Sequence, residues 1–224
     1  MKVTDLVRDF VFGMEDGLVS NLGLVLGVYM GGGESFTIIL AGLASMFAGA
    51  FSMSAGSYLS AKSQREIYEN EIESTRRELE KNPSQCVSEM KKILRKEGLT
   101  PKDVDSLFKS SPSTKHPEFV CNYMVQNKVG ISAKKLELPF KNAVTMFVSF
   151  LIGSAFPIAP FIFFKEITAS IIAAILTVIA LFFVGFAKST FTKRSGIKSG
   201  IEIVIVGLIA GSIGYIVGLI LSMF

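Results

Sequence analysis

Long apolar stretches alternate with polar segments along this chain of 224 residues. Five stretches reach about 20 residues or more; the first contains two acids and the other four contain no charged residue: 10–31, 36–61, 142–164, 167–187 and 203–224. An α-helix needs about 20 residues to cross a hydrocarbon core of roughly 30 Å. The pattern therefore predicts five transmembrane helices.

The long polar segment between the second and third spans has a helical pattern. Its first part, "KSQREIYENEIESTRRELEKN", lacks Gly and Pro and is rich in helix formers, so we expect the second span to continue into it as one long helix. Asn82-Pro83 ends this helix, because the residue before a proline is driven away from the αR conformation. Three further helices are predicted, from Pro83 to Gly98, from Pro101 behind Thr100 as N-cap, and over 117–129.

These elements predict an all-α membrane protein in three parts. Residues 1–61 hold spans one and two, residues 62–141 form a helical domain, and residues 142–224 hold spans three to five. Pro157 and Pro160 are expected to kink or break the third span. Glycines spaced at i, i+4, i+7 and i+11 in the fifth span, and Gly23 with Gly27 in the first, predict close helix packing.

Composition and charge agree with membrane embedding. Half of the residues are hydrophobic and the mean hydropathy is +0.48, which is unusual for a soluble protein of this length. Among the short connections, Lys2, Arg8 and four basic residues of 188–198 would lie on one side of the bilayer, and only Lys165 on the other. The excess of Lys and Arg on the cytosolic side predicts that the N-terminus and the 62–141 domain are cytosolic and the C-terminus is outside.

Asp16 is the leading candidate for chemistry, because an ionisable group within a span usually marks an ion or proton route. A carboxylate near the middle of a bilayer costs about 2.5–3.5 kcal/mol on insertion scales, and its oxygens are natural ligands for divalent cations. A structural acid hydrogen-bonded near Ser20 or Asn21 is the alternative. Glu15 points about 100° away and serves either the inner mouth of the route or only the interface. Met53, in "FSMSAGS" of the second span, is either packing or a soft ligand that favours a transition metal.

The 62–141 domain offers weaker candidates. Cys86 and Glu89 are three residues apart on one predicted helical face, and Glu78 lies on the preceding helix. With Met124 they would make a mixed oxygen and sulfur site for one metal ion, although such residues more often pack or line a solvated face. His116 is the only histidine, and no catalytic triad, phosphate-binding loop or hydrolase pair of acids is present. We therefore expect neither an enzyme nor a bound cofactor, and no nucleic-acid partner.

The motifs resemble those of the vacuolar iron transporter family over essentially the whole chain. The resemblance lies in "EDGLVSNLGLVLGV", "AGLASMFAGAFSMSAGSYLSAKSQREIYENEI" and "GSAFPIAPF", in that order. It implies a homodimer of five-span protomers that moves Fe²⁺, and in some members Mn²⁺, Co²⁺ or Zn²⁺, out of the cytosol in exchange for protons. It also implies that a helical cytosolic domain gathers the metal.

The resemblance assigns roles to individual residues. Asp16 matches the translocation carboxylate at the dimer interface, and Met53 matches the pore methionine. Ser45 stands where plant members have a further acid. The predicted translocation pathway therefore consists of Glu15, Asp16, Asn21, Ser45, Ser52 and Met53.

The cytosolic domain departs from the family pattern of glutamates. Thr75, Cys86 and Lys128 stand at glutamate positions, so only Glu78 and Glu89 remain, beside Met124. A site with these residues would bind one softer metal ion or none, and multi-iron storage is not expected.

Two alternatives to an iron exporter remain. One is a transporter that prefers Mn²⁺, Co²⁺ or Zn²⁺, because the remaining ligands include sulfur. The other is a membrane-anchored metal-responsive or scaffold protein whose helical domain binds a partner. The short chain favours a prokaryotic plasma membrane over a vacuole.

Overall fold

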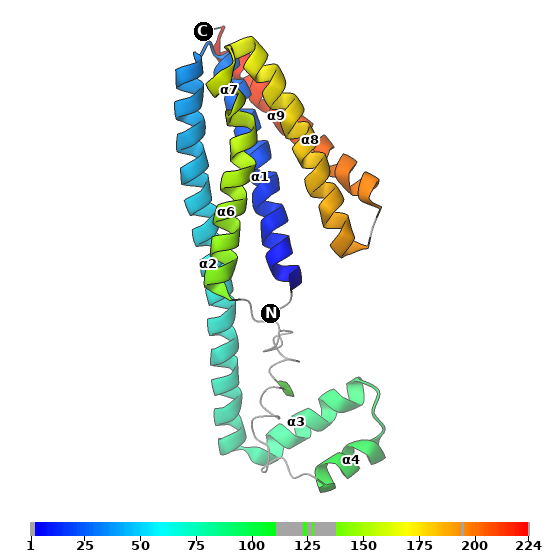
Figure 1. The fold of residues 1–224 in the computed structure, drawn as a ribbon. Helices are drawn as coiled ribbons and strands as arrows, with labels where there is room; N and C mark the ends of the chain where they lie inside the picture. Colours follow the sequence, from blue (N-terminus) through cyan, green and yellow to red (C-terminus); the bar gives the residue numbers. More distant parts are fainter. Residues whose placement is uncertain (1–2, 111–122, 125–126, 128–137, 194, 224) are drawn as a thin grey trace. The chain divides into compact units, whose positions relative to one another are not determined.

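The computed structural model describes residues 3–110, 123–124, 127, 138–193 and 195–223, and the elements in these ranges are helices (Figure 1). They are α1 (Val3–Met30), α2 (Ser35–Lys81), α3 (Pro83–Lys96), α4 (Pro101–Ser110), α6 (Pro139–Ile158), α7 (Pro160–Phe163), α8 (Glu166–Thr192) and α9 (Gly196–Leu221). Five of them are long and apolar enough to cross a membrane: α1, α2, α6, α8 and α9. The prediction of an all-α protein with five spans is confirmed.

The chain divides into two compact units, one of residues 60–138 and one of residues 2–59 with 139–224. We call the first the polar unit and the second the span unit. Helix α2 runs without a break through both stretches, as the absence of Gly and Pro after residue 61 predicts. It ends at Lys81, directly before Asn82-Pro83.

Helix α1 lies within the span unit and packs against α6, α8 and α9 (Figure 1). Glycines allow α1 and α9 to approach closely, because a Cβ at Gly214 would lie 2.1 Å from the carbonyl oxygen of Gly23. The same distance separates a Cβ at Gly218 from the carbonyl oxygen of Gly27. The glycine stripes that the sequence shows are therefore packing surfaces, as predicted.

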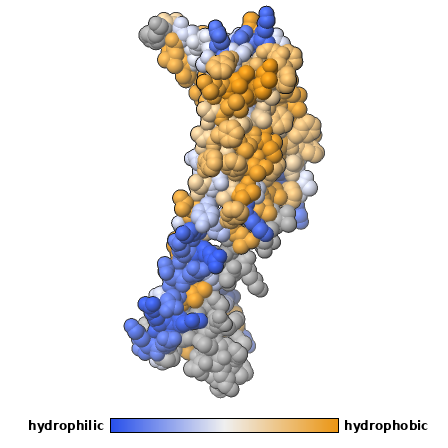
Figure 2. All heavy atoms as spheres, turned by 60° about the vertical axis from the view of Figure 1, so that its left-hand side comes forward, coloured by the Kyte–Doolittle hydropathy of each residue, from blue (hydrophilic) through white to orange (hydrophobic). Residues whose placement is uncertain are grey.

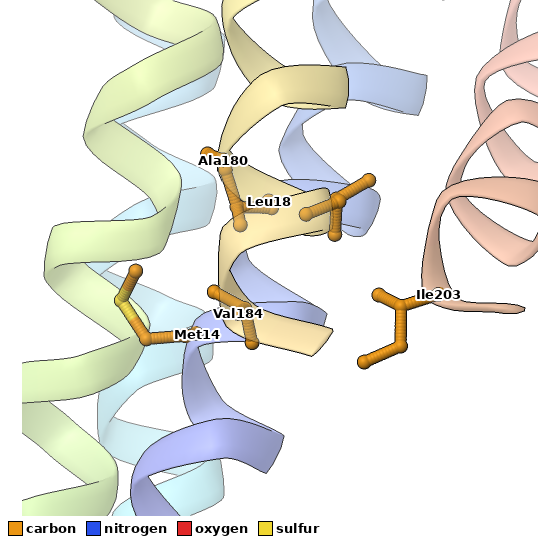
Figure 3. Packing of buried hydrophobic residues seen from close by; sticks show 6 residues of the cluster. Met14, Leu18, Ala180, Val184 and Ile203 are labelled. Atoms are coloured by element: carbon orange, nitrogen blue, oxygen red, sulfur yellow. The ribbon is translucent and has the colours of Figure 1, made fainter. Parts of the chain in front are cut away.

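An apolar cluster joins α1 to α8 and α9 (Figure 3). Figure 3 shows Met14 and Leu18 from α1 beside Ala180 and Val184 from α8, with Ile203 of α9 nearby. Leu18 and Leu181 of this cluster are completely buried. The cluster holds the first half of α1 in place, which is the part that carries Glu15 and Asp16.

Helix α2 packs on α6 and leaves much of its surface exposed. The rings of Phe51 and Phe147 meet edge to face at 5.2 Å, and the ring of Phe150 covers Gly49. Figure 2 shows the face of the span unit in view covered largely with apolar side chains. Helix α2 exposes five large apolar side chains in its first half: Phe36, Leu40, Leu43, Phe47 and Phe51. A surface of this kind requires lipid or another protein against it.

The third span breaks where its two prolines predict. Helix α6 ends at Ile158, one residue after Pro157, and the short helix α7 starts at Pro160. Near this end of the span unit, the carboxylate of Glu166 accepts hydrogen bonds from Ser35 Oγ at 2.8 Å and from Ser35 N at 3.3 Å. The start of α2 is thereby fastened to the start of α8.

The polar unit contains its own small apolar core. Met90 and Leu94 of α3 and Val104 of α4 are buried together with Met124. Thr100 accepts a hydrogen bond from the backbone N–H of Asp103, which confirms its predicted role as the cap of α4. The predicted helix over 117–129 lies largely outside the described residues.

Candidate functional site

The candidate site is built on the face of α1 that meets α6. A Cβ at Gly13 would lie 2.1 Å from Ser149 Oγ, and one at Gly17 would lie 2.5 Å from the carbonyl oxygen of Phe150. The two helices run parallel in close backbone contact, since these glycines lie one turn apart and meet successive turns of α6. Small residues make this approach possible where no hydrophobic effect drives helices together.

Buried polar side chains continue this contact beyond the glycines. Asn21 Nδ2 donates to Ser154 Oγ at 2.9 Å, and Ser154 Oγ donates to the backbone oxygen of Phe150 at 2.7 Å. Asn21 and Ser154 are both completely buried, and Asn21 Oδ1 has no hydrogen-bond partner among the described residues. The predicted pathway residue Asn21 thus lies inside the helix bundle of the single chain, between two spans.

Asp16 lies on α1, between Glu15 and Gly17, and is half-buried. Its backbone oxygen accepts a hydrogen bond from Ser20 Oγ at 2.5 Å, so Ser20 contacts the backbone of this residue and not its carboxylate. Neither Ser20 nor Asn21 neutralises the carboxylate through a described hydrogen bond. A carboxylate held at this depth in an apolar helix has the chemistry of a cation or proton acceptor.

Glu15 lines a pocket of about 350 Å³ between α1 and α8. Arg8 and Lys188 supply the basic groups of its wall, and the remaining wall is apolar, with Phe12 and Phe191. Lys188, Asp16 and Glu202 each interact electrostatically with Glu15. Glu15 therefore belongs to a charged group contributed by three helices, which the sequence analysis left open.

Asp9 is a second buried carboxylate on α1 that the sequence analysis missed. It is 3% exposed, and its Oδ1 accepts hydrogen bonds from Arg8 Nη2 at 2.9 Å and Nε at 3.1 Å. Its Oδ2 has no hydrogen-bond partner among the described residues. Asp9 lies one helical turn before Gly13, directly before the apolar stretch that begins at Phe10.

Met53, Ser52 and Ser45 lie on α2. Met53 and Ser45 are half-buried, and Ser52 is exposed. Helix α6 contacts α2 through Phe147 and α1 through Ser149, so it packs against both helices that carry the predicted pathway. The contacts described within one protomer do not join Asp16 to Met53.

The candidate ligands of the polar unit are spread over its surface and core. Glu78 is exposed on α2, Glu89 is half-buried on α3, and Met124 is fully buried in the apolar cluster. Cys86 falls within α3, but its side chain lies outside the described part of the chain. The position of Met124 favours a core role, and its role as a ligand stays a prediction.

Metal-binding clusters were sought in the same part of the chain. Within the described ranges, no three side chains of His, Cys, Asp or Glu come together in an arrangement that could hold a metal ion. Thr75, which stands at a predicted glutamate position, is 1% exposed, so a carboxylate there would be buried. Cys121, His116 and Lys128 lie outside the described residues.

The sequence held signals for some of the residues that its analysis missed. Ser149 and Ser154 are hydroxyl residues within an uncharged span, and Glu202 follows Lys198 at the start of the fifth span. Their partners were not evident, because the contacts join residues more than 100 positions apart.

Comparisons with known proteins found a family model and relatives that cover most of the chain. Residues 7–219 match the family model described as the VIT family. The chain is 30% identical over 213 residues to "Vacuolar iron transporter 1" of Tulipa gesneriana, covering 95% of this chain and 85% of that protein. It is 28% identical to "Vacuolar iron transporter 1" of Eucalyptus grandis, with 94% and 84% covered, and 27% identical to "Protein CCC1" of Saccharomyces cerevisiae, with 92% and 66% covered.

Proposed function

Because the chain belongs to the VIT family, we propose that it transports divalent transition-metal ions across a membrane, with Fe²⁺ as the principal cargo. The relatives that carry the name vacuolar iron transporter align with nearly the whole chain, spans included. This makes the protein a transporter and not an enzyme.

The observation that carries the residue assignment is the place of Asp16. It is a half-buried carboxylate on a span whose apolar neighbours, such as Met14 and Leu18, are fixed by packing. In our proposal this carboxylate binds the metal ion on its way through the bilayer and binds a proton when the metal has left. Fe²⁺ suits an oxygen ligand of this kind, and Met53 adds a softer sulfur ligand.

A second copy of the chain is part of the proposal. The contacts within one protomer do not join Asp16 to Met53, and the outer face of α2 exposes a row of large apolar residues. We propose that two protomers meet over α1 and α2, so that both residues line one pathway with Ser45 and Ser52. Asn21 would support α1 from inside each protomer through its bond to Ser154.

The proposed orientation rests on the distribution of basic residues, and the direction of transport is proposed from the family resemblance. Lys2, Arg8 and the basic residues of 188–198 favour a cytosolic N-terminal end of α1 and a cytosolic polar unit. Metal would leave the cytosol while protons enter it, and a plasma membrane is the proposed location. Mn²⁺, Co²⁺ and Zn²⁺ are candidate second cargoes.

The test is a flux assay with purified protein in liposomes, with a proton gradient that drives protons in the direction opposite to the metal ions. Asp16→Asn keeps the size of the side chain and removes its charge, and we expect it to abolish Fe²⁺ uptake. Glu34→Gln is the matched control, because Glu34 is an exposed carboxylate outside the helices, and uptake should persist.

Each outcome bears on a different part of the proposal. Transport that continues in Asp16→Asn excludes this carboxylate as the essential ligand. A wild-type protein that moves none of the four metals would contradict transport itself and favour a membrane-anchored scaffold. Uptake without accompanying proton movement would retain metal transport and reject the exchange.

A further inference from the structure

The pocket between α1 and α8 contains one acid and two basic residues, and these basic residues are in different situations. Arg8 binds the buried carboxylate of Asp9, with Nη2 to Oδ1 at 2.9 Å. Lys188, on the last turns of α8, lines the same pocket as Glu15 and interacts with it electrostatically. The cation that acts on Glu15 is therefore Lys188, supplied by a different helix from the one that carries the acid.

The negative charges near Glu15 outnumber the one positive charge of Lys188. Asp16 follows directly in α1, and Glu202 of α9 also acts on Glu15. Glu15 thus has two carboxylates and one ammonium group acting on it, contributed by its own helix and by two others. Such a group of charges at the end of apolar helices attracts cations, and the ammonium group competes with any cation that arrives.

The ammonium group of Lys188 and an arriving cation would compete for Glu15 in this pocket. The pocket measures about 350 Å³ and is lined by the N-terminal half of α1, from Val7 to Glu15, and by the last turns of α8. Phe12 and Phe191 form apolar walls, which reduce the screening of charges by water. A hydrated divalent ion that enters here meets Glu15, the one acid among the residues that line this pocket.

We propose that Lys188 is an internal counter-cation that occupies Glu15 and competes with divalent metal at this pocket, so that it sets the apparent affinity for metal on the N-terminal side of α1. This inference rests on the proposed transport function. Lys188 is a positioning residue in this scheme and does not bind the metal. Metal binding displaces the ammonium group from Glu15, and departure of the metal allows the pair to form again.

The experiment compares initial rates of Mn²⁺ uptake against Mn²⁺ concentration for the full chain in liposomes, with metal supplied on the N-terminal side of α1. Lys188→Gln should lower KM by about three- to tenfold, the effect expected for a half-buried charge pair, while kcat changes little. Lys188→Arg keeps the charge and should restore the wild-type KM. Lys193→Gln removes a charge from the same end of α8, outside the pocket, and should leave KM unchanged.

A double variant tests the partner. In a Glu15→Gln background, Lys188→Gln should change KM much less, because the acid that Lys188 occupies is gone. An unchanged or raised KM in Lys188→Gln overturns the inference, and so does an equal effect in Lys193→Gln.

Binding separates this inference from the transport proposal. Mn²⁺ affinity of the detergent-solubilised protein, followed by electron paramagnetic resonance, should also tighten in Lys188→Gln. A wild type that binds Mn²⁺ but moves none of Fe²⁺, Mn²⁺, Co²⁺ and Zn²⁺ contradicts the proposed function alone. If the wild type transports metal normally and Lys188→Gln binds Mn²⁺ with the same affinity as the wild type, only the proposed role of Lys188 is contradicted.

Discussion

Asn21 of α1 donates a hydrogen bond to Ser154 of α6 at 2.9 Å, and both side chains are completely buried. The residues are 133 positions apart in sequence. This bond ties the helix that carries Asp16 to the helix that packs on α2, at the level where Gly17 brings the two backbones together. A buried polar contact within the chain therefore helps to fix α1, the helix that carries Asp16, against α6.

Ser154→Ala should lower the thermal stability of the protein. Interhelical hydrogen bonds in membrane proteins contribute about 0.6 kcal/mol on average and at most about 1.7 kcal/mol. The loss should lie in this range, because Asn21 Nδ2 keeps its weaker bond to the backbone oxygen of Gly17 at 3.3 Å. Reversible unfolding in detergent micelles measures the difference. Ser212→Ala is the control, since Ser212 is exposed and its described hydrogen bond goes to Leu208 of its own helix. An equal loss of stability in Ser212→Ala would show that the contact between Ser154 and Asn21 adds nothing specific.

Gly17→Ala should be far more harmful than Ser154→Ala. The new Cβ would lie 2.5 Å from the carbonyl oxygen of Phe150 and 2.9 Å from the backbone nitrogen of Ser154, and backbone atoms cannot move aside. We expect α1 to shift away from α6 and uptake to be lost, with a lower unfolding temperature. Size-exclusion chromatography after heating, together with the flux assay, measures both effects.

Gly31→Ala makes the same chemical change at the end of α1. Its Cβ would lie 3.4 Å from the nearest atom, which is an ordinary contact. Stability and uptake should stay close to those of the wild type. If Gly17→Ala behaved like Gly31→Ala, the close approach of α1 and α6 would not be required for function.

The local elements of this fold could be predicted from the sequence because their signals are local. The end of α2 before Pro83, the break near Pro157 and the cap at Thr100 each depend on residues within one or two turns. The contact of Asn21 with Ser154 and the shared pocket of Glu15 and Lys188 depend on how helices assemble. Nothing in the apolar runs indicates which faces of five similar spans will meet.

Asp9 shows that the sequence also limits what can be predicted of the candidate site. It lies directly before the apolar stretch that begins at Phe10, and its burial arises from tertiary packing. Asp16 was found because an acid inside an apolar run is conspicuous without any tertiary information. The pathway residues on α2 stay predictions for the related reason that their proposed partners lie in a second copy.

Arg8→Gln should destabilise the start of α1. Asp9 is 3% exposed, so removal of Arg8 leaves a buried carboxylate without the guanidinium that binds its Oδ1. A fully buried pair loses about 3–5 kcal/mol when one partner is removed, and the loss here should be smaller because Arg8 is largely exposed. The double variant Arg8→Gln with Asp9→Asn should recover part of the loss, since the unpaired charge is removed as well. Thermal unfolding of the four proteins forms a double-mutant cycle, and additive effects would show that the two residues do not interact.

Substitutions of Met124 distinguish a packing role from a metal-binding role in the polar unit. Met124 is completely buried with Met90, Leu94 and Val104, so Met124→Leu keeps the volume and should cost less than about 1.5 kcal/mol. Met124→Ala should cost about 2–5 kcal/mol, because it leaves a cavity in a small core. If the sulfur atom were a ligand, Met124→Leu would weaken binding of a borderline metal ion such as Co²⁺ without a loss of stability. We expect the opposite, with Co²⁺ binding unchanged in Met124→Leu, and calorimetric titration of both variants measures it.

Glu89→Gln is the companion variant, because Glu89 is half-buried on the same helix as Met90 and keeps access to solvent. Reduced Co²⁺ binding in Glu89→Gln, together with unchanged binding in Met124→Leu, would assign any site in this unit to the carboxylates and leave Met124 to the core.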